Sequence, residues 1–416
     1  MRFSVLIPSR NRVDLARTAI LSVLRQDFDD FEIVLSDNAS DDDYASMSAS
    51  FGDRRIKRCR LDDPVPVTSN WNNALAQAAG EYVIMLGDDD ALAPGGLSHL
   101  NDLIVRHGEP EVIFSTAYHY VYPNVMPSIP RGGFATFEPR PIFSDGASGA
   151  FLDIARARYF AAQALKFRLL FGFNSQYFLW HRRFIEGLSG FGPFFQSPYP
   201  DFYSSIVTML TASRIFLNPE PVAIIGISPK SFGFYLHNDK IHAGNEMLRL
   251  DMSDADPVRA VIPGAGDALD LSGSPHYRNW LIAALYVVRN LGGRFDLSID
   301  LTRFRKVQTF ETAYQYASQK RMTKGQVQAF KAQLSPRERR LFALSSWIFA
   351  LSSPLSWVLA LMRRTQQNIH DRLFALFRIY SKPGIVFHDI GPHLGIADAW
   401  AWLDRRNSST PCNSSL

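Results

Sequence analysis

Three adjacent aspartates, Asp88, Asp89 and Asp90, are the residues of this chain whose type and spacing are best suited to chemistry. They follow an apolar run, 82–86, and a single glycine, so we expect them at the carboxyl end of a buried strand. Hard divalent cations take oxygen ligands, usually one or two carboxylates together with substrate phosphates. Ligands of open α/β sheets bind at the carboxyl ends of the strands. The triplet therefore predicts a site for a cation and phosphate, and a solvated acidic turn is the alternative.

The elements upstream of the triplet predict a parallel sheet. Residues 3–8 form a short apolar run, typical of a buried strand, and residues 14–25 have the apolar spacing of a helix. A second apolar run, 31–35, ends in the polar segment 36–42. Strand, helix and strand in this order indicate a parallel βαβ unit. A Gly-x-Gly-x-x-Gly motif does not follow the first strand, so a dinucleotide-binding Rossmann domain is disfavoured.

Four segments, in order along the chain, resemble family 2 glycosyltransferases. They are 4–12, 19–27, 31–42 and the pair 70–75 and 79–90, which together cover roughly the first 100 residues. The resemblance implies a GT-A fold, which is an α/β, Rossmann-like core that binds a nucleotide-diphosphate sugar. It also implies a divalent metal, Mn²⁺ or Mg²⁺. We expect a mainly α-helical extension after this core.

The resemblance also implies roles for residues that bind the donor. Asp37 is similar to the carboxylate that accepts a hydrogen bond from the base or the ribose. Pro8 and Arg10 fall where the base and phosphates are cradled, and the rigid donor fork of arginine suits phosphate. Asn72, in the fourth segment, is assigned to the nucleotide sugar. A strand terminator and a solvated loop charge are the alternatives for Pro8 and Arg10.

Within the triplet, the assignment of each carboxylate stays open. Gly87 stands where many relatives carry the first aspartate of an Asp-x-Asp motif. We expect Asp88 on the ribose side and close to the metal, Asp90 on the metal, and Asp89 in the nucleotide-sugar site without a fixed partner. His237 is the candidate for a further metal ligand by its position in a later loop. Lys230 and Ser231 are alternative residues that close over the phosphates.

An inverting transfer needs a general base, which the family places about 100 residues after the triplet, at the start of a helix. Asp201 follows Pro200 and precedes the apolar run 206–210. Proline and a carboxylate both suit the first turn of a helix, so a helix-start role is the structural alternative. We predict Asp201 as the catalytic base.

The composition is that of a globular protein, with 46% hydrophobic and 20% charged residues in 416. We divide the chain into a catalytic domain, 1–250, with a nucleotide-sugar half, 1–108, and an acceptor half, 109–250. A linker, 251–275, a helical and basic extension, 276–406, and a disordered tail, 407–416, follow. Two distant cysteines, Cys59 and Cys412, predict neither a disulfide nor a zinc site and indicate a reducing compartment. The chain enters a strand at once, so we expect no signal peptide.

The charge of the extension predicts a membrane partner. Residues 294–378 hold 15 Lys and Arg against 5 Asp and Glu, whereas the whole chain has a net charge of +4. The segment 341–362 lacks charges but is split by Pro354, and 369–380 is amphipathic. We expect 337–380 to lie on the inner face of a cell membrane as a peripheral, cytoplasmic contact. A helical subdomain packed on the core or a dimer interface is the alternative, and nucleic-acid binding is not expected.

The sequence thus predicts an inverting, metal-dependent glycosyltransferase. Its donor is a nucleotide-diphosphate sugar, and its acceptor is a hydroxyl of a saccharide or lipid-linked molecule in surface polysaccharide or glycolipid synthesis. A non-catalytic nucleotide-sugar-binding protein remains as an alternative. A phosphotransferase with a haloacid-dehalogenase-like Asp-x-Asp motif is less favoured, because that motif ends the first strand of its fold.

Overall fold

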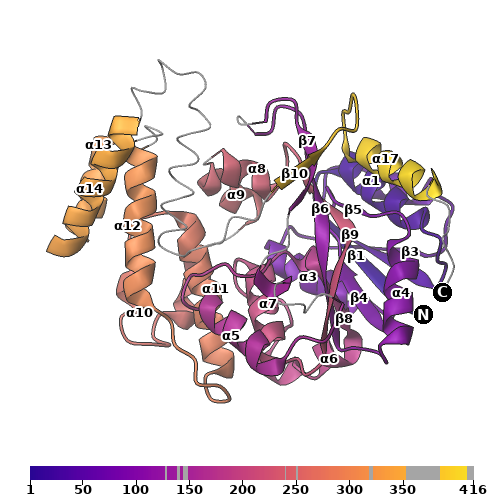
Figure 1. The fold of residues 1–416 in the computed structure, drawn as a ribbon, viewed down its shortest axis with the longest axis horizontal. Coiled ribbons are helices and arrows are strands. Elements are labelled where there is room, and N and C mark those ends of the chain that lie inside the picture. The colour runs from indigo at the N-terminus through magenta and orange to yellow at the C-terminus, as the bar shows by residue number, and fades with distance from the viewer. Residues whose placement is uncertain are drawn as a thin grey trace.

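The computed structural model describes residues 1–126, 129–137, 141–143, 149–238, 240–249, 252–317, 322–352 and 385–409. Its centre is one mixed sheet whose main path has the order β10-β7-β6-β8-β4-β1-β2-β3 (Figure 1). The strands are β1 (Phe3–Ser9), β2 (Phe31–Asp37), β3 (Ile56–Arg60), β4 (Tyr82–Met85), β5 (Ala91–Leu92), β6 (Val112–Val121), β7 (Gly133–Phe137), β8 (Phe178–His181), β9 (Ile215–Ile227) and β10 (Ile385–His388).

Helices cover both faces of this sheet and extend beyond it. They are α1 (Val13–Leu24), α2 (Tyr44–Ala49), α3 (Val67–Ala76), α4 (Gly96–Arg106), α5 (Ile154–Ala164), α6 (Arg182–Glu186), α7 (Pro200–Thr211), α8 (Phe232–His237), α9 (Ile241–Met247), α10 (Ala265–Leu269), α11 (Pro275–Leu291), α12 (Leu301–Ala317), α13 (Lys324–Ala332), α14 (Pro336–Ser352) and α17 (Ile396–Ser409). Short 3₁₀ turns, η1 (Pro141–Phe143), η2 (Ser175–Tyr177), η3 (Ser189–Phe191) and η4 (Met252–Val258), lie between them.

The predicted parallel βαβ unit is confirmed. β1 pairs in parallel with both β2 and β4, with Ser9 opposite Asp37. Side chains alternate along β1, so Phe3, Val5 and Ile7 enter one core cluster while Leu6 enters the other. The loops that follow these three strands therefore emerge at one edge of the sheet, where the aspartate triplet also lies.

The first helix is held at this edge by the neighbouring loop. The backbone N–H of Val13 donates to Asp42 Oδ2 at 3.0 Å, which satisfies one of the free donors at the start of α1. The residue before it, Arg12, supplies no capping hydrogen bond of its own. Tertiary contact thus fixes where the loop 9–12 ends and the helix begins.

Residues 252–275, within the segment 251–275 expected to be a linker, are part of the folded core. They include η4 and α10, and Ala255, Val258 and Leu269 are buried in the same cluster as α7 and α11. The described Asp, Gly and Pro residues lie partly within η4 and α10, and the apolar residues between them supply the buried contacts. The linker prediction is wrong for this reason, and the catalytic half and α11–α13 share one continuous core.

The C-terminal end of the described chain returns to the central sheet. β10 adds an antiparallel edge strand to β7, and α17 packs beside α1 (Figure 1). Trp400 of α17 is buried, and its Nε1 donates to Leu92 O at 2.8 Å. α17 continues to Ser409, so residues 407–409, expected in a disordered tail, are helical. The extension predicted for 276–406 is therefore not helical throughout, since β10 belongs to the sheet.

The apolar stretch of the extension is only partly described. Residues 341–352 belong to α14, which packs on α12 through Phe342 and Phe349, while the rest of 337–380 lies outside the described residues. No helix in the described part of the chain is both long and apolar enough to cross a bilayer.

Candidate active site

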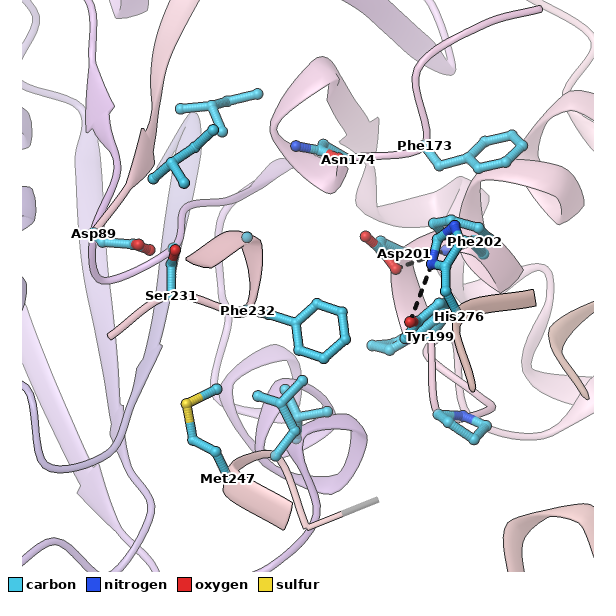
Figure 2. A pocket seen from close by; sticks show the side chains of 18 of the residues that line it. Asp89, Phe173, Asn174, Tyr199, Asp201, Phe202, Ser231, Phe232, Met247 and His276 are labelled. Atoms are coloured by element: carbon cyan, nitrogen blue, oxygen red, sulfur yellow. Dashed lines mark hydrogen bonds between the residues drawn. The ribbon is translucent and has the colours of Figure 1, made fainter. Parts of the chain in front are cut away.

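One cavity of about 1570 Å³ joins the edge of the sheet to the helical part of the chain. The loop after β1, the aspartate triplet, the start of α7 and the start of α11 all contribute to its lining. Figure 2 shows Asp89 on one side of this cavity and Asp201 on the opposite side, with Phe232 between them.

Asp88 is neutralised by the protein itself. Arg12 Nη1 lies 2.8 Å from Asp88 Oδ1, and Ser9 donates its hydroxyl to the other oxygen. Burial lowers the pKa of the Arg12 guanidinium, but Asp88 and Asp89 outweigh that effect and raise it above its ordinary value. Arg12 is thus firmly charged and pairs with the carboxylate that the sequence predicts on the ribose side and close to the metal.

Asp89 and Asp90 are held mainly by donors from β9 and its following turn. Ser228 Oγ donates to Asp89 Oδ2 at 2.9 Å, and Gly226 N–H donates to Asp90 Oδ1 at 2.8 Å. Gly87 N–H and Gln176 Nε2 donate to the second oxygen of Asp90. Burial raises the pKa of both carboxyl groups, and the charge of the preceding aspartate raises each further.

Two glycines make this close packing possible. A Cβ at Gly226 would lie 1.8 Å from the backbone oxygen of Asp89, so no other residue permits β9 to approach the triplet. A Cβ at Gly87 would lie 2.5 Å from Asp90 Oδ2. With glycine at this position, Asp90 folds back to accept the Gly87 N–H.

The chemistry of the triplet fits a divalent cation. Two adjacent buried carboxylates whose pKa values are raised by burial and repulsion are stabilised in their charged form by a nearby positive ion. Asp90 already accepts three N–H donors, whereas among the described residues Asp89 accepts one side-chain hydrogen bond. In the described part of the chain no three His, Cys, Asp or Glu side chains converge as a metal site. An ion held here would therefore share one or two carboxylates with phosphate oxygens, as magnesium commonly does.

Asp201 begins α7 as predicted and lines the cavity. Its Oδ1 accepts the N–H of Phe202 at 2.9 Å, and burial raises the pKa of its carboxyl group to about 7. The next residue, Phe202, packs against Phe173 at a centroid distance of 4.5 Å and against Trp280 at 5.4 Å, so this end of α7 lies among aromatic side chains. A carboxylate with a pKa near neutrality is suited to accept a proton during turnover.

A tyrosine and a histidine lie beside this carboxylate. Tyr199 OH and His276 Nδ1 are 3.2 Å apart, and Figure 2 shows the pair next to Asp201. His276 comes from the first turn of α11, 75 residues after Asp201 in the chain. Neither residue was predicted from the sequence: Tyr199 directly precedes α7 but carries no signal of its own, and no local pattern links His276 to that helix start.

The residues predicted to bind the nucleotide-sugar donor divide into those that line the cavity and those that do not. Pro8, Arg10 and all three aspartates line the cavity, and Arg10 Nε is buried there without a hydrogen-bond partner among the described residues. Ser231 also lines it, whereas Lys230 reaches Asn11 O at 3.4 Å. The Nε–H of Arg10 is thus available as a hydrogen-bond donor in the cavity that the aspartate triplet also lines.

Asp37 and Asn72 are not among the residues that line the cavity. Asp37 is fully buried, and its Oδ2 lies 2.8 Å from Arg60 Nη1, while its neighbour Asn38 reaches the lining. Asn72 Nδ2 donates to Phe195 O at 2.8 Å and its Oδ1 accepts the Phe195 N–H, so it ties α3 to the loop before Asp201. Both residues thus make contacts within the protein, and their assignment to the nucleotide sugar stays a prediction.

The remaining predicted ligand is His237, which ends α8, and its side chain lies outside the described part of the structure. Arg12 received no role from the sequence, although it lies in the first segment of the family resemblance, 4–12. Gln176, Ser228 and Gly226 carry no signal in their own segments, because they meet the triplet only through the fold of β9 and η2.

Comparisons with known proteins agree with the fold and with the resemblance. Residues 4–162 match the family model "Glycosyl transferase family 2". The chain is 42% identical over 102 residues to a Campylobacter jejuni GalNAc(5)-diNAcBac-PP-undecaprenol beta-1,3-glucosyltransferase, a match that covers 24% of this chain and 33% of that protein. It is 34% identical over 97 residues to the putative colanic acid biosynthesis glycosyl transferase WcaA of Escherichia coli, over 23% of this chain and 35% of the relative. The match therefore spans about a third of the length of these relatives.

Among solved structures, S. aureus TarS 1–349 in complex with UDP-GlcNAc is similar, with 15% identity and a TM-score of 0.46, over 86% of this chain and 92% of that one. The expected class, a GT-A-type α/β core with helices in the C-terminal part, is confirmed.

Proposed function

We propose that this chain transfers a sugar from a nucleotide-diphosphate sugar to an acceptor hydroxyl with inversion, since residues 4–162 match the glycosyl transferase family 2 model. The observation that carries the proposal is the placement of Asp89 and Asp201 on opposite walls of one cavity. One wall then binds the leaving diphosphate, and the other holds a base for the incoming hydroxyl. Relatives in the family are named for polysaccharide and glycolipid steps, and this chain is assigned to the same kind of synthesis.

In the transfer, the acceptor oxygen forms a bond to the anomeric carbon while the bond from that carbon to the diphosphate oxygen breaks. Asp201 accepts the proton of the hydroxyl, since its raised pKa makes it a stronger base than an ordinary aspartate. Attack from the Asp201 side and departure on the triplet side invert the anomeric configuration.

The donor end of the cavity is assigned to the diphosphate. Arg10 supplies an uncommitted donor, and Arg12 keeps Asp88 in place. Asp89 and Asp90 would hold Mn²⁺ or Mg²⁺, with Asp89 as the more available ligand and Asp88 excluded by its ion pair. When bound, such an ion neutralises charge that develops on the leaving diphosphate. His237 stays a proposed further ligand.

We also propose that the acceptor reaches this site at the inner face of a membrane. Leu344 and Trp347 of α14 are 56% and 62% exposed, and the helix begins with the exposed residues Arg337, Arg339 and Arg340. Apolar side chains beside arginines are favoured at an anionic lipid surface. The opposite face of α14 packs on α12, so the expected helical subdomain and the membrane contact are compatible.

Release of nucleoside diphosphate from a panel of sugar nucleotides, with Mn²⁺ or Mg²⁺ and a membrane extract as acceptor, tests the proposal. We expect one donor to turn over, and Asp89→Asn and Asp201→Asn both to lose turnover. Isothermal titration should show that Asp89→Asn alone loses metal-dependent donor binding. Donor binding without turnover under any condition would replace the proposal with the nucleotide-sugar-binding protein.

A further inference from the structure

The hydroxyl of Tyr44 contacts both of the residues that hold the first aspartate of the triplet. Tyr44 is the first residue of α2, is 1% exposed, and does not belong to the lining of the cavity. Its hydroxyl oxygen lies 2.5 Å from Ser9 Oγ and accepts the backbone N–H of Arg12 at 3.0 Å. Ser9 and Arg12 are the described residues whose side chains bind the two carboxylate oxygens of Asp88. One hydroxyl outside the cavity thus supports the position of Asp88 inside it.

The direction of each hydrogen bond follows from the groups involved. The Asp88 carboxylate, which pairs with Arg12, can only accept, so the Ser9 hydroxyl donates its single hydrogen to Asp88 Oδ2 at 2.5 Å. Ser9 Oγ then acts as an acceptor, and the Tyr44 hydroxyl donates to it. Burial and the charge of Asp88 both raise the pKa of Tyr44, so its hydroxyl keeps this hydrogen. A chain of donors therefore runs from Tyr44 through Ser9 to Asp88.

These contacts set the orientation of the Asp88 carboxylate. The χ2 torsion of an aspartate has no sharp preference of its own, so the partners of the two oxygens decide it. Arg12 Nη1 binds Oδ1 and Ser9 binds Oδ2. An ionised carboxylate has about four acceptor sites, and the described residues use one on each oxygen. Asp88 lines the cavity, so a ligand there can donate hydrogen bonds to the same carboxylate.

The loop 9–12 also depends on the segment that follows β2. Asn11 has a φ of 53°, a left-handed conformation that residues other than glycine rarely adopt. Its N–H donates to Ser40 Oγ at 3.1 Å, and its side-chain oxygen accepts the N–H of Asp41 at 2.8 Å. The segment after β2 thus holds the loop in this conformation, and Tyr44 is the residue of that segment whose hydrogen bonds continue to the triplet.

We propose that Tyr44 is a positioning residue of the donor site: through Ser9 it fixes Asp88 so that the carboxylate accepts hydrogen bonds from the ribose hydroxyls of the nucleotide sugar. The inference rests on the proposed function and on the ribose side that the sequence predicts for Asp88. The ribose of a nucleotide sugar offers hydroxyl donors on neighbouring carbons, and the acceptor sites left on the two Asp88 oxygens match them. Tyr44 itself touches no substrate, since it lies outside the cavity lining.

The test removes one oxygen atom from a buried ring. Tyr44→Phe keeps the ring that packs in the core and loses only the hydroxyl. Tyr82→Phe is the matched control, because Tyr82 is fully buried in the same core cluster and its hydroxyl donates to Pro110 O at 2.9 Å, with neither residue in the cavity lining. Effects that come from stability alone should therefore be alike in the two variants.

Titration calorimetry with UDP, GDP and dTDP in the presence of Mn²⁺, each compared with its 2′,3′-dideoxy form, measures the role of Tyr44 in the full chain. For the diphosphate that the wild type binds, we expect Tyr44→Phe to weaken binding about tenfold, the effect of one or two lost hydrogen bonds. Binding of the dideoxy form should not change. Ser9→Ala should behave in the same way, and Tyr44→Phe should add no further loss to it. Tyr82→Phe should bind both forms as the wild type does.

Kinetics with the sugar nucleotide supply a second readout. A residue that only orients a binding group acts equally on the ground state and the transition state. Tyr44→Phe should therefore raise the donor KM about tenfold and leave kcat and the acceptor KM unchanged.

Three results would overturn the inference: equal weakening of both forms of the nucleotide by Tyr44→Phe, unchanged binding of both forms, or equal effects of Tyr44→Phe and Tyr82→Phe. The proposed function would stand in each of these cases as long as the wild type transfers a sugar. A wild type that distinguishes the two forms of the nucleotide but transfers no sugar would instead contradict the proposed function, and the role of Tyr44 in nucleotide binding would stand.

Discussion

Arg12 Nη1 lies 2.8 Å from Asp88 Oδ1, with the Asp88 side chain 3% exposed. Three consecutive carboxylates at the end of a strand repel one another, and this ion pair neutralises the first of them without any ligand. The other two accept hydrogen bonds from N–H and hydroxyl donors, and burial and mutual repulsion raise the pKa of both carboxyl groups. The negative charge left for a cation is therefore concentrated at Asp89 and Asp90.

Removal of the Arg12 guanidinium should destabilise the folded state. Arg12→Gln leaves a buried carboxylate without its counter-charge, so we expect a loss of about 3 kcal/mol in the free energy of unfolding. The double variant Arg12→Gln/Asp88→Asn should recover much of that loss, because both charges are gone. Urea unfolding of the wild type, both single variants and the double variant measures the coupling. Additive losses would show that the pair makes no net contribution.

The raised pKa of Asp201 predicts the pH dependence of turnover. The base must be ionised, so kcat/KM should rise with pH and level off above about 7. Asp201→Asn should lose turnover at every pH. Its affinity for the sugar donor should stay near the wild-type value. A pH profile whose acid limb is centred near pH 4 would contradict the raised pKa.

The raised pKa of Asp201 also lowers the free energy of unfolding at high pH, where the wild type is otherwise best suited to turnover. The folded state binds the Asp201 proton up to a pH of about 7, while the unfolded chain releases it near pH 4, so this group stabilises the fold least above pH 7. Asp201→Asn cannot ionise and should therefore have a higher melting temperature than the wild type at pH 8. At pH 4 the two melting temperatures should agree closely. Calorimetric scans at both values check the sign.

The contact between β9 and the triplet depends on one glycine. Gly226→Ala places a Cβ 1.8 Å from Asp89 O, so we expect the triplet to shift and turnover to fall by more than about a hundredfold, since misplacement of about 1 Å is this costly. Gly293→Ala, which meets nothing within 4 Å, is the matched control and should keep full activity. Comparable activity of the two variants would show that β9 tolerates displacement here.

Trp400 of α17 and Trp347 of α14 should have different roles, the first in stability and the second in membrane binding. Trp400 is buried in α17, so Trp400→Ala should lower the free energy of unfolding by about 3 kcal/mol through the cavity it leaves. Trp347 is exposed, and Trp347→Ala should change stability by less than about 0.5 kcal/mol. In co-sedimentation with anionic vesicles the effects should be reversed, with binding lost only in Trp347→Ala. Unchanged vesicle binding by Trp347→Ala would contradict the proposed membrane contact of α14.

Much of the donor half could be predicted from the sequence, since its signals are local. The apolar runs and helical spacing of residues 3–35 specified the βαβ unit, and the end of a strand specified the edge at which the triplet lies. Proline followed by aspartate specified the start of α7 and the position of Asp201. Each of these inferences uses neighbours within one element, where periodicity and turn chemistry act directly.

Only the tertiary structure decided which of these residues share a cavity. Asp37 and Asn72 stand in motif positions, yet neither lines the cavity, and they contact Arg60 and Phe195 instead. Tyr199 and His276 meet across 77 positions, and Ser228 meets Asp89 across 139. Contacts this distant in sequence leave no local period, because they depend on how strands and helices pack after they form.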